Sequence, residues 1–107
     1  MQDRPGFYQG RHYTDYGIQV VSFINRGQFN QAEDLLLHLV DAVEAENQVE
    51  QIGVAPWYYK QLAQVYHTRG DYDAEIRILE RCVQQQNTDA PGVVRRLRYA
   101  RGLLQMA

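Results

Sequence analysis

The chain has 107 residues, with 11 basic and 13 acidic side chains and a formal net charge of −2 at pH 7. This length favours a single domain, and the charge balance argues against a generic polyanion binder and against an acidic disordered chain. Cys82 is the single cysteine, so an internal disulfide is excluded and a disulfide-built secreted scaffold is not expected. The longest apolar run, Leu35–Leu37, is too short for a bilayer span or a signal-peptide core, so we expect no membrane association and a cytoplasmic location.

Residues 1–13 contain Pro5, Gly6 and Gly10 and show no periodicity, which predicts an N-terminal arm. The arm also carries three aromatic residues, more apolar surface than a free tail exposes. We expect that it either packs on the body or marks a boundary within a longer parent chain. Its aromatic residues are Phe7, Tyr8 and Tyr13.

Helical periodicity starts at Thr14, which suits an N-cap, and continues to Gly27, which suits a helix stop. A second helix follows, with Asn30 and Glu33 at the spacing of a capping-box variant. These two helices are predicted to form a hairpin over residues 14–50. Their apolar stripes are Tyr16, Val20, Phe23 and Ile24 in the first helix, and Ala32, Leu35, Leu36, Leu39, Val40 and Val43 in the second.

The second half of the chain contains similar signals for the starts of helices. Pro56 suits the first turn of a third helix, and Asp71 can cap a fourth, so a second hairpin is predicted over residues 56–87. Pro91 then restarts a fifth helix over residues 91–106, which would cap the stack within a helical domain of residues 14–107. No segment alternates with period two, so the predicted fold class is all-α with five helices, and a sheet is not expected.

Two segments, which start at Tyr16 and Tyr59, align without a gap and define an internal repeat with an offset of 43 residues. Gly27 and Gly70 fall at the same position of this repeat, so we expect equivalent tight turns between antiparallel helices. A helix–turn–helix unit that repeats at this scale is typical of an α-solenoid. The residues predicted to be mostly buried are Tyr16, Phe23, Leu36, Tyr59, Leu62, Tyr66 and Leu79.

The repeat resembles the tetratricopeptide repeat family over roughly residues 14–104. The second hairpin is the closer match, with Tyr59, Leu62, Ala63 and Tyr66 followed by Gly70, Asp71 and Tyr72 at the turn. Two features depart from the family: the offset exceeds its usual ~34 residues, and Glu75 stands where a small residue is expected. The resemblance implies a short solenoid that acts as a protein–protein interaction module, an adaptor or scaffold with no catalysis of its own.

In this family the first helix of each hairpin lines a concave, peptide-binding groove. Only Lys60 matches the Lys and Asn side chains with which chaperone-binding members hold a terminal carboxylate, so that ligand is not implied. We expect Trp57 and Tyr58 at the exposed start of the third helix, with the alternative that Trp57 packs under the arm. The register implies partner-binding residues Trp57, Lys60, Gln64 and His67 in the third helix, and Gly17, Val21, Ile24 and Asn25 in the first.

Other chemistry has little support in the sequence. The three histidines are spread over different elements without ligand spacing, so neither a metal site nor a cofactor is expected. His67 is either a groove contact or a solvent-exposed helix residue, and Cys82 is expected to be buried and unreactive. The acidic residues of the second helix fall between its apolar positions, which predicts a solvated face. Without a nucleophile elbow or a phosphate loop, the chain is not expected to be an enzyme.

The charge is unevenly distributed. Residues 28–55 carry six acidic side chains and no Lys or Arg, and the predicted fifth helix carries a basic patch. We expect this patch to pair with acidic residues of a neighbouring helix or subunit or to solubilise the chain; the alternative is a nucleic-acid-associated adaptor. A homodimer is also expected, because two hairpins and one helix are fewer than the three repeats that solenoids need. The patch consists of Arg95, Arg96, Arg98 and Arg101.

Overall fold

The computed structural model describes residues 4–106, so residues 1–3 of the predicted arm and residue 107 lie outside the described part. Within it, five α-helices follow a short N-terminal hairpin, which confirms the predicted all-α class. The helices are α1 (Gly17–Asn25), α2 (Phe29–Glu50), α3 (Pro56–Thr68), α4 (Tyr72–Val83) and α5 (Pro91–Met106). The hairpin consists of β1 (Phe7–Tyr8) and β2 (Arg11–His12), and a 3₁₀ helix, η1 (Tyr13–Tyr16), connects it to α1.

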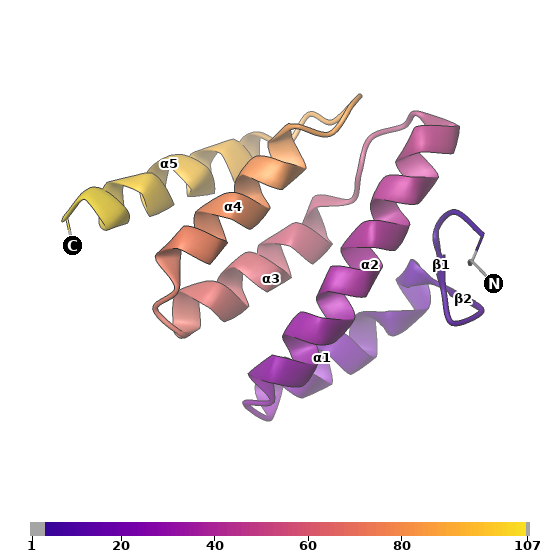
Figure 1. The fold of residues 1–107 in the computed structure, drawn as a ribbon, viewed down its shortest axis with the longest axis horizontal. Helices are drawn as coiled ribbons and strands as arrows, with labels where there is room; N and C mark the ends of the chain where they lie inside the picture. Colours follow the sequence, from indigo (N-terminus) through magenta and orange to yellow (C-terminus); the bar gives the residue numbers. More distant parts are fainter. Residues whose placement is uncertain (1–3, 107) are drawn as a thin grey trace.

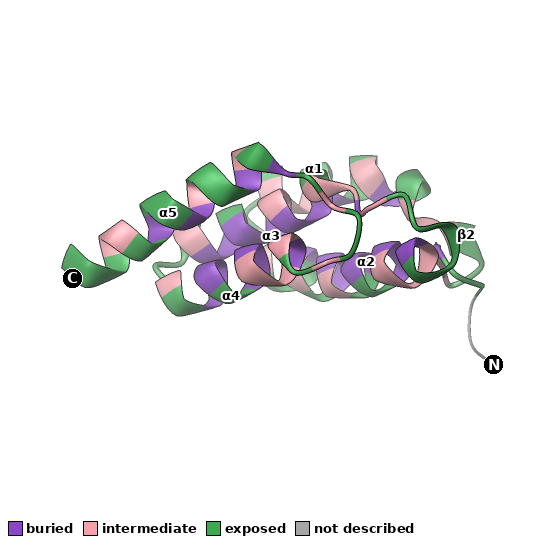
Figure 2. Cartoon of the chain, turned by 90° about the horizontal axis from the view of Figure 1, so that it is seen from above, coloured by how far each residue is buried: buried purple, intermediate pink, exposed green. Residues whose placement is uncertain are grey.

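Each helix packs chiefly against its neighbours in the sequence, so the five helices succeed one another from one end of the molecule to the other (Figure 1). In Figure 2, α1 and α5 lie on the upper side and α2 and α4 on the lower side, with α3 between them. The molecule measures 44 × 33 × 20 Å, and its smallest dimension corresponds to two helix diameters.

The two predicted tight turns are equivalent, as expected from the repeat. Gly27 and Gly70 have positive φ angles of 71° and 75°, a conformation that glycine adopts without a steric penalty. In each turn the glycine amide donates to the carbonyl three residues before it, at 3.0 Å in both cases. The next amide reaches the carbonyl five residues before it, which completes the same C-terminal cap twice.

The core runs through all five helices and contains six of the seven residues that the repeat predicted to be buried. Phe23 is the exception, because it is half-buried and packs against the edge of the core. Tyr59, Leu36, Leu62 and Leu79 are fully shielded from solvent.

Two predicted helix starts are wrong. Thr14 does not cap α1, because η1 occupies that position and the His12 Nδ1 accepts the Thr14 amide at 3.3 Å. Asn30 and Glu33 do not form a capping box at the start of α2; both side chains bind Arg69 instead. A guanidinium forms stronger, charge-assisted hydrogen bonds than a backbone amide does, which explains the preference. The Asp71 cap is confirmed, with its carboxylate accepting the Ala74 amide at 3.2 Å.

The arm packs on the body, and it forms the small antiparallel sheet that the sequence did not predict, with Phe7 paired to His12. Strands of two residues are too short to show a period of two. The arm is anchored on α2, where Glu46 binds the His12 Nε2 at 2.7 Å and the Tyr13 hydroxyl at 3.0 Å. Because His12 Nδ1 accepts a hydrogen bond, Nε2 carries the proton and donates it to Glu46.

Candidate functional site

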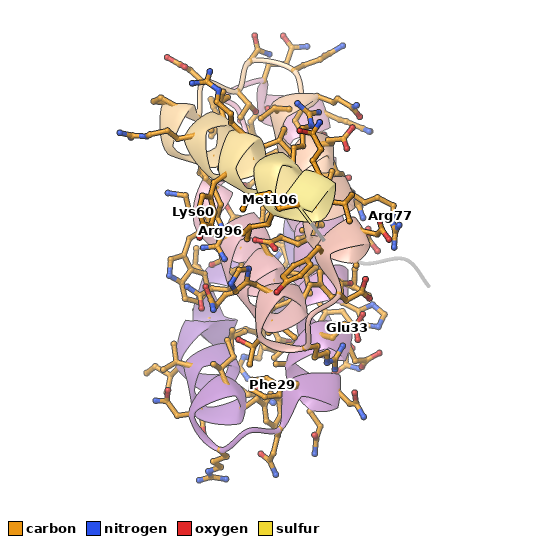
Figure 3. All side chains as sticks on the ribbon, turned by 90° about the vertical axis from the view of Figure 1, so that its left-hand side faces the viewer. Phe29, Glu33, Lys60, Arg77, Arg96 and Met106 are labelled. Carbon is orange, nitrogen blue, oxygen red and sulfur yellow. The ribbon has the colours of Figure 1, made fainter. Side chains whose placement is uncertain are left out.

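Side chains from three helices surround a pocket of about 270 Å³ between α3 and α5. Three of its residues belong to the sets singled out in the sequence: Gln64 and His67 of α3, and Arg96 of α5. Figure 3 shows Lys60, the next groove residue along α3, beside Arg96, while Arg77 of α4 lies on the other side of the molecule. The pocket is lined by Gln64, His67, Glu75, Arg96 and Tyr99. We use the name α3–α5 groove for this pocket together with three neighbouring residues of the same two helices, Trp57, Lys60 and Arg95.

Glu75 forms the base of the groove, and its side chain is only 1% exposed. A buried carboxylate needs opposite charges and hydrogen bonds to compensate for its lost hydration. His67 Nδ1 lies 3.1 Å from one Glu75 oxygen, and Arg96 Nε lies 3.5 Å from the other. A charged residue therefore occupies the position where the resemblance implies a small one. This pairing also corrects the view of His67 as a simple solvent-exposed residue.

The hydrogen-bond donors of the groove differ in how accessible they are to a ligand. The Arg96 Nη2 donates to the Gln64 side-chain Oε1 at 2.8 Å, and the Arg96 Nε is buried beside Glu75, without a hydrogen bond to any described residue and out of reach of a ligand. Tyr99 is 64% exposed, and its hydroxyl binds no other residue of the described part. A groove with unused donors is suited to a ligand with hydrogen-bond acceptors, such as a carboxylate or a peptide carbonyl.

The other predicted partner-binding residues do not line the pocket itself. Trp57 is 36% exposed and lies edge-on against Tyr58. Tyr58 is buried, contrary to the expected exposed position, because its ring packs against Tyr13 of the arm at 5.2 Å. Tyr58, rather than Trp57, therefore fills the space under the arm. Val21 and Asn25 are exposed on α1 and do not line the α3–α5 pocket.

The basic patch on α5 is divided between two roles. Arg96 reaches Glu75, and Arg101 lies 3.7 Å from Glu80 of α4, so these two pair with a neighbouring helix as expected. Arg95 and Arg98 are exposed and form no ion pair with any residue that the structure describes. Two cations therefore remain available to a partner.

The predicted solvated acidic face of α2 is wrong for three of its carboxylates. The Glu33 carboxylate accepts one hydrogen bond from Arg69 Nη1 at 2.7 Å and another from the Tyr66 hydroxyl at 2.8 Å. The hydrogen bond from Arg69 lowers the pKa of Glu33, while burial, reinforced by Glu33, raises the pKa of Tyr66 to about 12. Glu44 is bound by Arg81, and Glu46 is bound by His12 of the arm. These carboxylates therefore stabilise the fold.

The charges differ between alternate helices of the chain. Helices α1, α3 and α5 together carry five Lys or Arg residues and no Asp or Glu. Helices α2 and α4 carry nine acidic residues and two arginines. The formal charge of α1, α3 and α5 together is therefore +5, whereas that of α2 and α4 together is −7. Such an asymmetry steers a partner of opposite charge to one side of the molecule.

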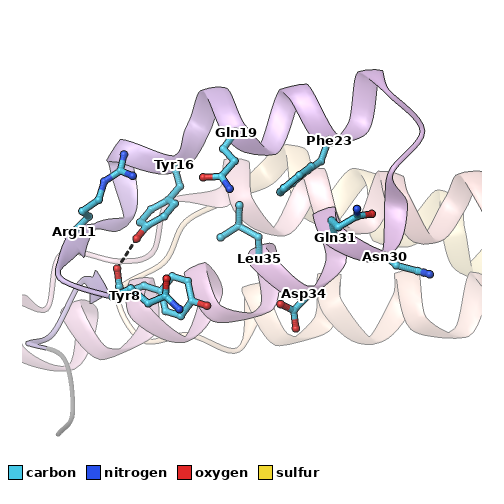
Figure 4. A pocket seen from close by; sticks show the side chains of 10 residues that line it. Tyr8, Arg11, Tyr16, Gln19, Phe23, Asn30, Gln31, Asp34 and Leu35 are labelled. Carbon is cyan, nitrogen blue, oxygen red and sulfur yellow. Dashed lines mark hydrogen bonds between the residues drawn. The ribbon is translucent and has the colours of Figure 1, made fainter.

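A second hollow, of about 520 Å³, lies between the arm, α1 and the first half of α2, and we call it the end cleft (Figure 4). Sequence reasoning missed it, because the cleft exists only where the arm folds back against α2. Its lining is Tyr8, Gln9, Arg11, Tyr16, Gln19, Phe23, Asn30, Gln31, Asp34 and Leu35.

No group of three or more His, Cys, Asp or Glu side chains within residues 4–106 is arranged to hold a metal ion. Cys82 is fully buried as predicted, and desolvation raises the pKa of its thiol to about 11. In the same part of the chain, none of the helices has the length and apolar character needed to cross a bilayer. No protein-family model, curated protein or solved structure matches the chain.

Proposed function

We propose that this protein is a protein–protein interaction module without catalysis of its own, and that it binds an acidic segment of a partner protein in the α3–α5 groove. The observation that carries the proposal is the charge of α1, α3 and α5, which carry five cations and no acidic side chain. Arg96 and Arg101 pair with Glu75 and Glu80 of α4, so Lys60, Arg95 and Arg98 are the cations without an ion pair among the described residues. The repeat pattern in the sequence supports the same function, because helix–turn–helix repeats present extended binding surfaces.

The side chains of the groove supply both affinity and orientation. Lys60 and Arg95 are cations without ion-pair partners among the described residues, and Arg95 lies one helical turn from the exposed ring of Tyr99. Trp57 lies one turn before Lys60, so an indole and an ammonium group face the same side of α3. Trp, Tyr and Arg are the residue types that dominate binding energy at protein interfaces.

The function is tested by titrating the full chain with a short peptide rich in glutamate, and with versions in which every glutamate is replaced by glutamine or by lysine. Trp57 is the only tryptophan, so its fluorescence reports on the groove directly. We expect the glutamate peptide to bind and the lysine peptide not to bind. Binding should weaken as salt is added, because the exposed charges are screened.

A matched pair of variants locates the binding surface. Arg95→Gln should weaken binding of the glutamate peptide by about two- to five-fold, as expected for the loss of one exposed charge. Arg77→Gln removes an exposed arginine from α4, on the other side of the molecule, and should leave binding unchanged. Equal effects of the two variants would show that net charge, and not the groove, attracts the peptide.

Binding of nucleic acid through the arginines of α5 is the competing function. Of the four arginines, Arg96 and Arg101 already pair with acidic side chains, so Arg95 and Arg98 are left for phosphates. A single-stranded oligonucleotide that binds more tightly than the glutamate peptide, with a steep dependence on salt, would favour this alternative.

We also propose a cytoplasmic location, since the single thiol is free and buried.

A further inference from the structure

The end cleft lies apart from the α3–α5 groove. In Figure 1 the arm is on the opposite side of α2 from α3, α4 and α5. The volume of about 520 Å³ falls within the range of about 300–1,000 Å³ that is usual for ligand sites. This cleft is therefore a candidate for a second, independent binding site.

The apolar wall of the cleft is fixed before any ligand arrives. The Tyr16 hydroxyl donates to the Tyr8 carbonyl at 2.6 Å, and Tyr16 is only 5% exposed. Leu35 is 7% exposed, while Phe23 is half-buried on the facing helix, and Figure 4 shows both side chains directed into the space between α1 and α2. A pre-formed wall avoids the entropy cost of ordering side chains on binding.

The rim of the cleft is rich in side-chain amides. Gln19 and Gln31 are exposed, and their side chains form no hydrogen bond with another described residue. The Asn30 side-chain Oδ1 accepts a hydrogen bond from Arg69 at 2.6 Å, which leaves the side-chain NH₂ group available. A primary amide offers both a donor and an acceptor, the same pair that a peptide group presents.

The charges of the cleft do not select a charged ligand. Arg11 and Asp34 have opposite signs and balance one another. Arg11 is already engaged, because its guanidinium donates to the Asp15 carbonyl at 3.0 Å and lies 4.7 Å from the centre of the Tyr16 ring.

Two of the three aromatic rings that line the cleft, those of Tyr8 and Tyr16, are already covered by other side chains. The Tyr8 ring is stacked on His38 at 4.6 Å, and Arg11 covers a face of Tyr16. A saccharide needs open aromatic faces, whereas an aliphatic side chain can contact ring edges and the side chain of Leu35. The lining therefore fits a peptide better than a carbohydrate.

We propose that the end cleft binds an extended, uncharged peptide segment of a partner protein. An aliphatic or aromatic side chain of that segment contacts Phe23 and Leu35, and the flanking peptide groups hydrogen-bond with Gln19 and Gln31. This site is independent of the acidic ligand assigned to the α3–α5 groove, and each can fail without the other.

The experiment uses the ¹⁵N-labelled full chain and N-acetyl-leucine N-methylamide, which has one apolar side chain between two peptide groups. We expect chemical-shift changes at the amides of Gln19, Phe23, Gln31 and Leu35, with half-saturation on the order of 1 mM for a ligand of this size. The alanine analogue should bind at least about tenfold more weakly, because most of the apolar contact is lost. The glutamate and lysine analogues should also bind more weakly than leucine.

Gln31→Ala should weaken binding of the leucine compound about five-fold through the lost hydrogen bonds. Gln48→Ala is the matched control, since Gln48 is an exposed glutamine of the same helix outside the cleft, and it should leave binding unchanged. The proposal is overturned if no shift occurs at the cleft up to about 10 mM, or if the charged analogues bind as well as leucine. Glucose shifting the same amides more strongly than the leucine compound would overturn it too.

Discussion

Arg81 of α4 donates hydrogen bonds to both carboxylate oxygens of Glu44 of α2, over 2.7 and 2.9 Å. The Tyr59 hydroxyl of α3 reaches the same carboxylate at 2.8 Å. One side chain of α2 thus joins three helices, and the Glu44 side chain is only 18% exposed. Charge-assisted bonds in such a sheltered place contribute more to stability than ion pairs on the surface.

Glu44→Gln should therefore lower the free energy of unfolding by about 1.5–3 kcal/mol, because charged hydrogen bonds are lost at a half-buried site. Asp41→Asn is the matched control: Asp41 also contacts Arg81, at 2.7 Å, but its side chain is 68% exposed. This control should cost less than about 1 kcal/mol. Urea denaturation of both variants measures the difference, and equal losses would contradict the role given to Glu44.

Leu62 is fully buried at the centre of α3, so truncating its side chain leaves a cavity. We expect Leu62→Ala to reduce the free energy of unfolding by about 2–5 kcal/mol. Ile52→Ala removes a side chain that is 73% exposed and should change stability by less than about 0.5 kcal/mol. Thermal unfolding followed by circular dichroism tests both, and a smaller loss for Leu62→Ala than for Ile52→Ala would refute this description of the core.

Gly6 and Gly10 in the arm form another matched pair. Both have positive φ angles, of 88° and 81°, so alanine carries a similar backbone penalty at either position. A Cβ atom at Gly6 would lie 2.6 Å from the Glu46 carboxylate, whereas a Cβ at Gly10 would meet nothing within 4 Å. Gly6→Ala would therefore displace the carboxylate that holds His12 and Tyr13.

We expect Gly6→Ala to cost about 1–2 kcal/mol more than Gly10→Ala, through the hydrogen bonds of Glu46. Limited proteolysis should cut the arm of Gly6→Ala faster than that of the other variant. Equal stability and equal cleavage rates would mean that the arm does not depend on Glu46.

Glu33 makes stability depend on pH in the acid range. Its hydrogen bond with Arg69 lowers its pKa in the folded state below the ordinary value of 4.5. A group with a lowered folded-state pKa stabilises the protein above its unfolded-state pKa, and this contribution disappears as the pH falls through the folded-state value. The protein should therefore lose stability as the pH drops below 4.5.

Glu33→Gln should show a smaller acid-induced loss than the natural chain, since glutamine does not titrate. Asp34→Asn, one residue further along α2 with a side chain that is 81% exposed, should retain the full loss. Urea midpoints measured at neutral pH and below pH 4 provide the comparison. The same pH dependence in all three proteins would exclude Glu33 as its source.

Self-association through the first or the last helix of each chain remains a prediction, and the exposed apolar residues of α1 form one of these two surfaces. Val20 is fully buried within the protomer, but Ile18 is 89% and Val21 42% exposed, three residues apart on the same helix face. A homodimer through this face should be disrupted by Ile18→Glu and unaffected by Ile52→Glu, whose side chain lies in the loop after α2 and is 73% exposed. Sedimentation equilibrium at micromolar concentration decides, and a monomer mass for the natural chain would disprove the dimer.

The sequence by itself determined the elements whose signals are local. Gly27 and Gly70 end their helices because the stop requires a positive φ, and Asp71 caps α4 with an amide three residues away. The spacing of apolar residues placed the core, apart from the half-buried Phe23. Each of these signals depends on residues within about one or two helical turns, so the sequence pattern contains them completely.

Only the tertiary structure determined which charged side chains are buried and paired, and where the arm docks. Glu75 is buried because His67 and Arg96 lie beside it, and Glu33 leaves its expected solvated face because Arg69, 36 positions away, is brought within 2.7 Å. The end cleft likewise exists only because the arm docks against α2. Whether a carboxylate is solvated or buried depends on which cation the fold places next to it, and the spacing of residues along one helix does not encode that partner.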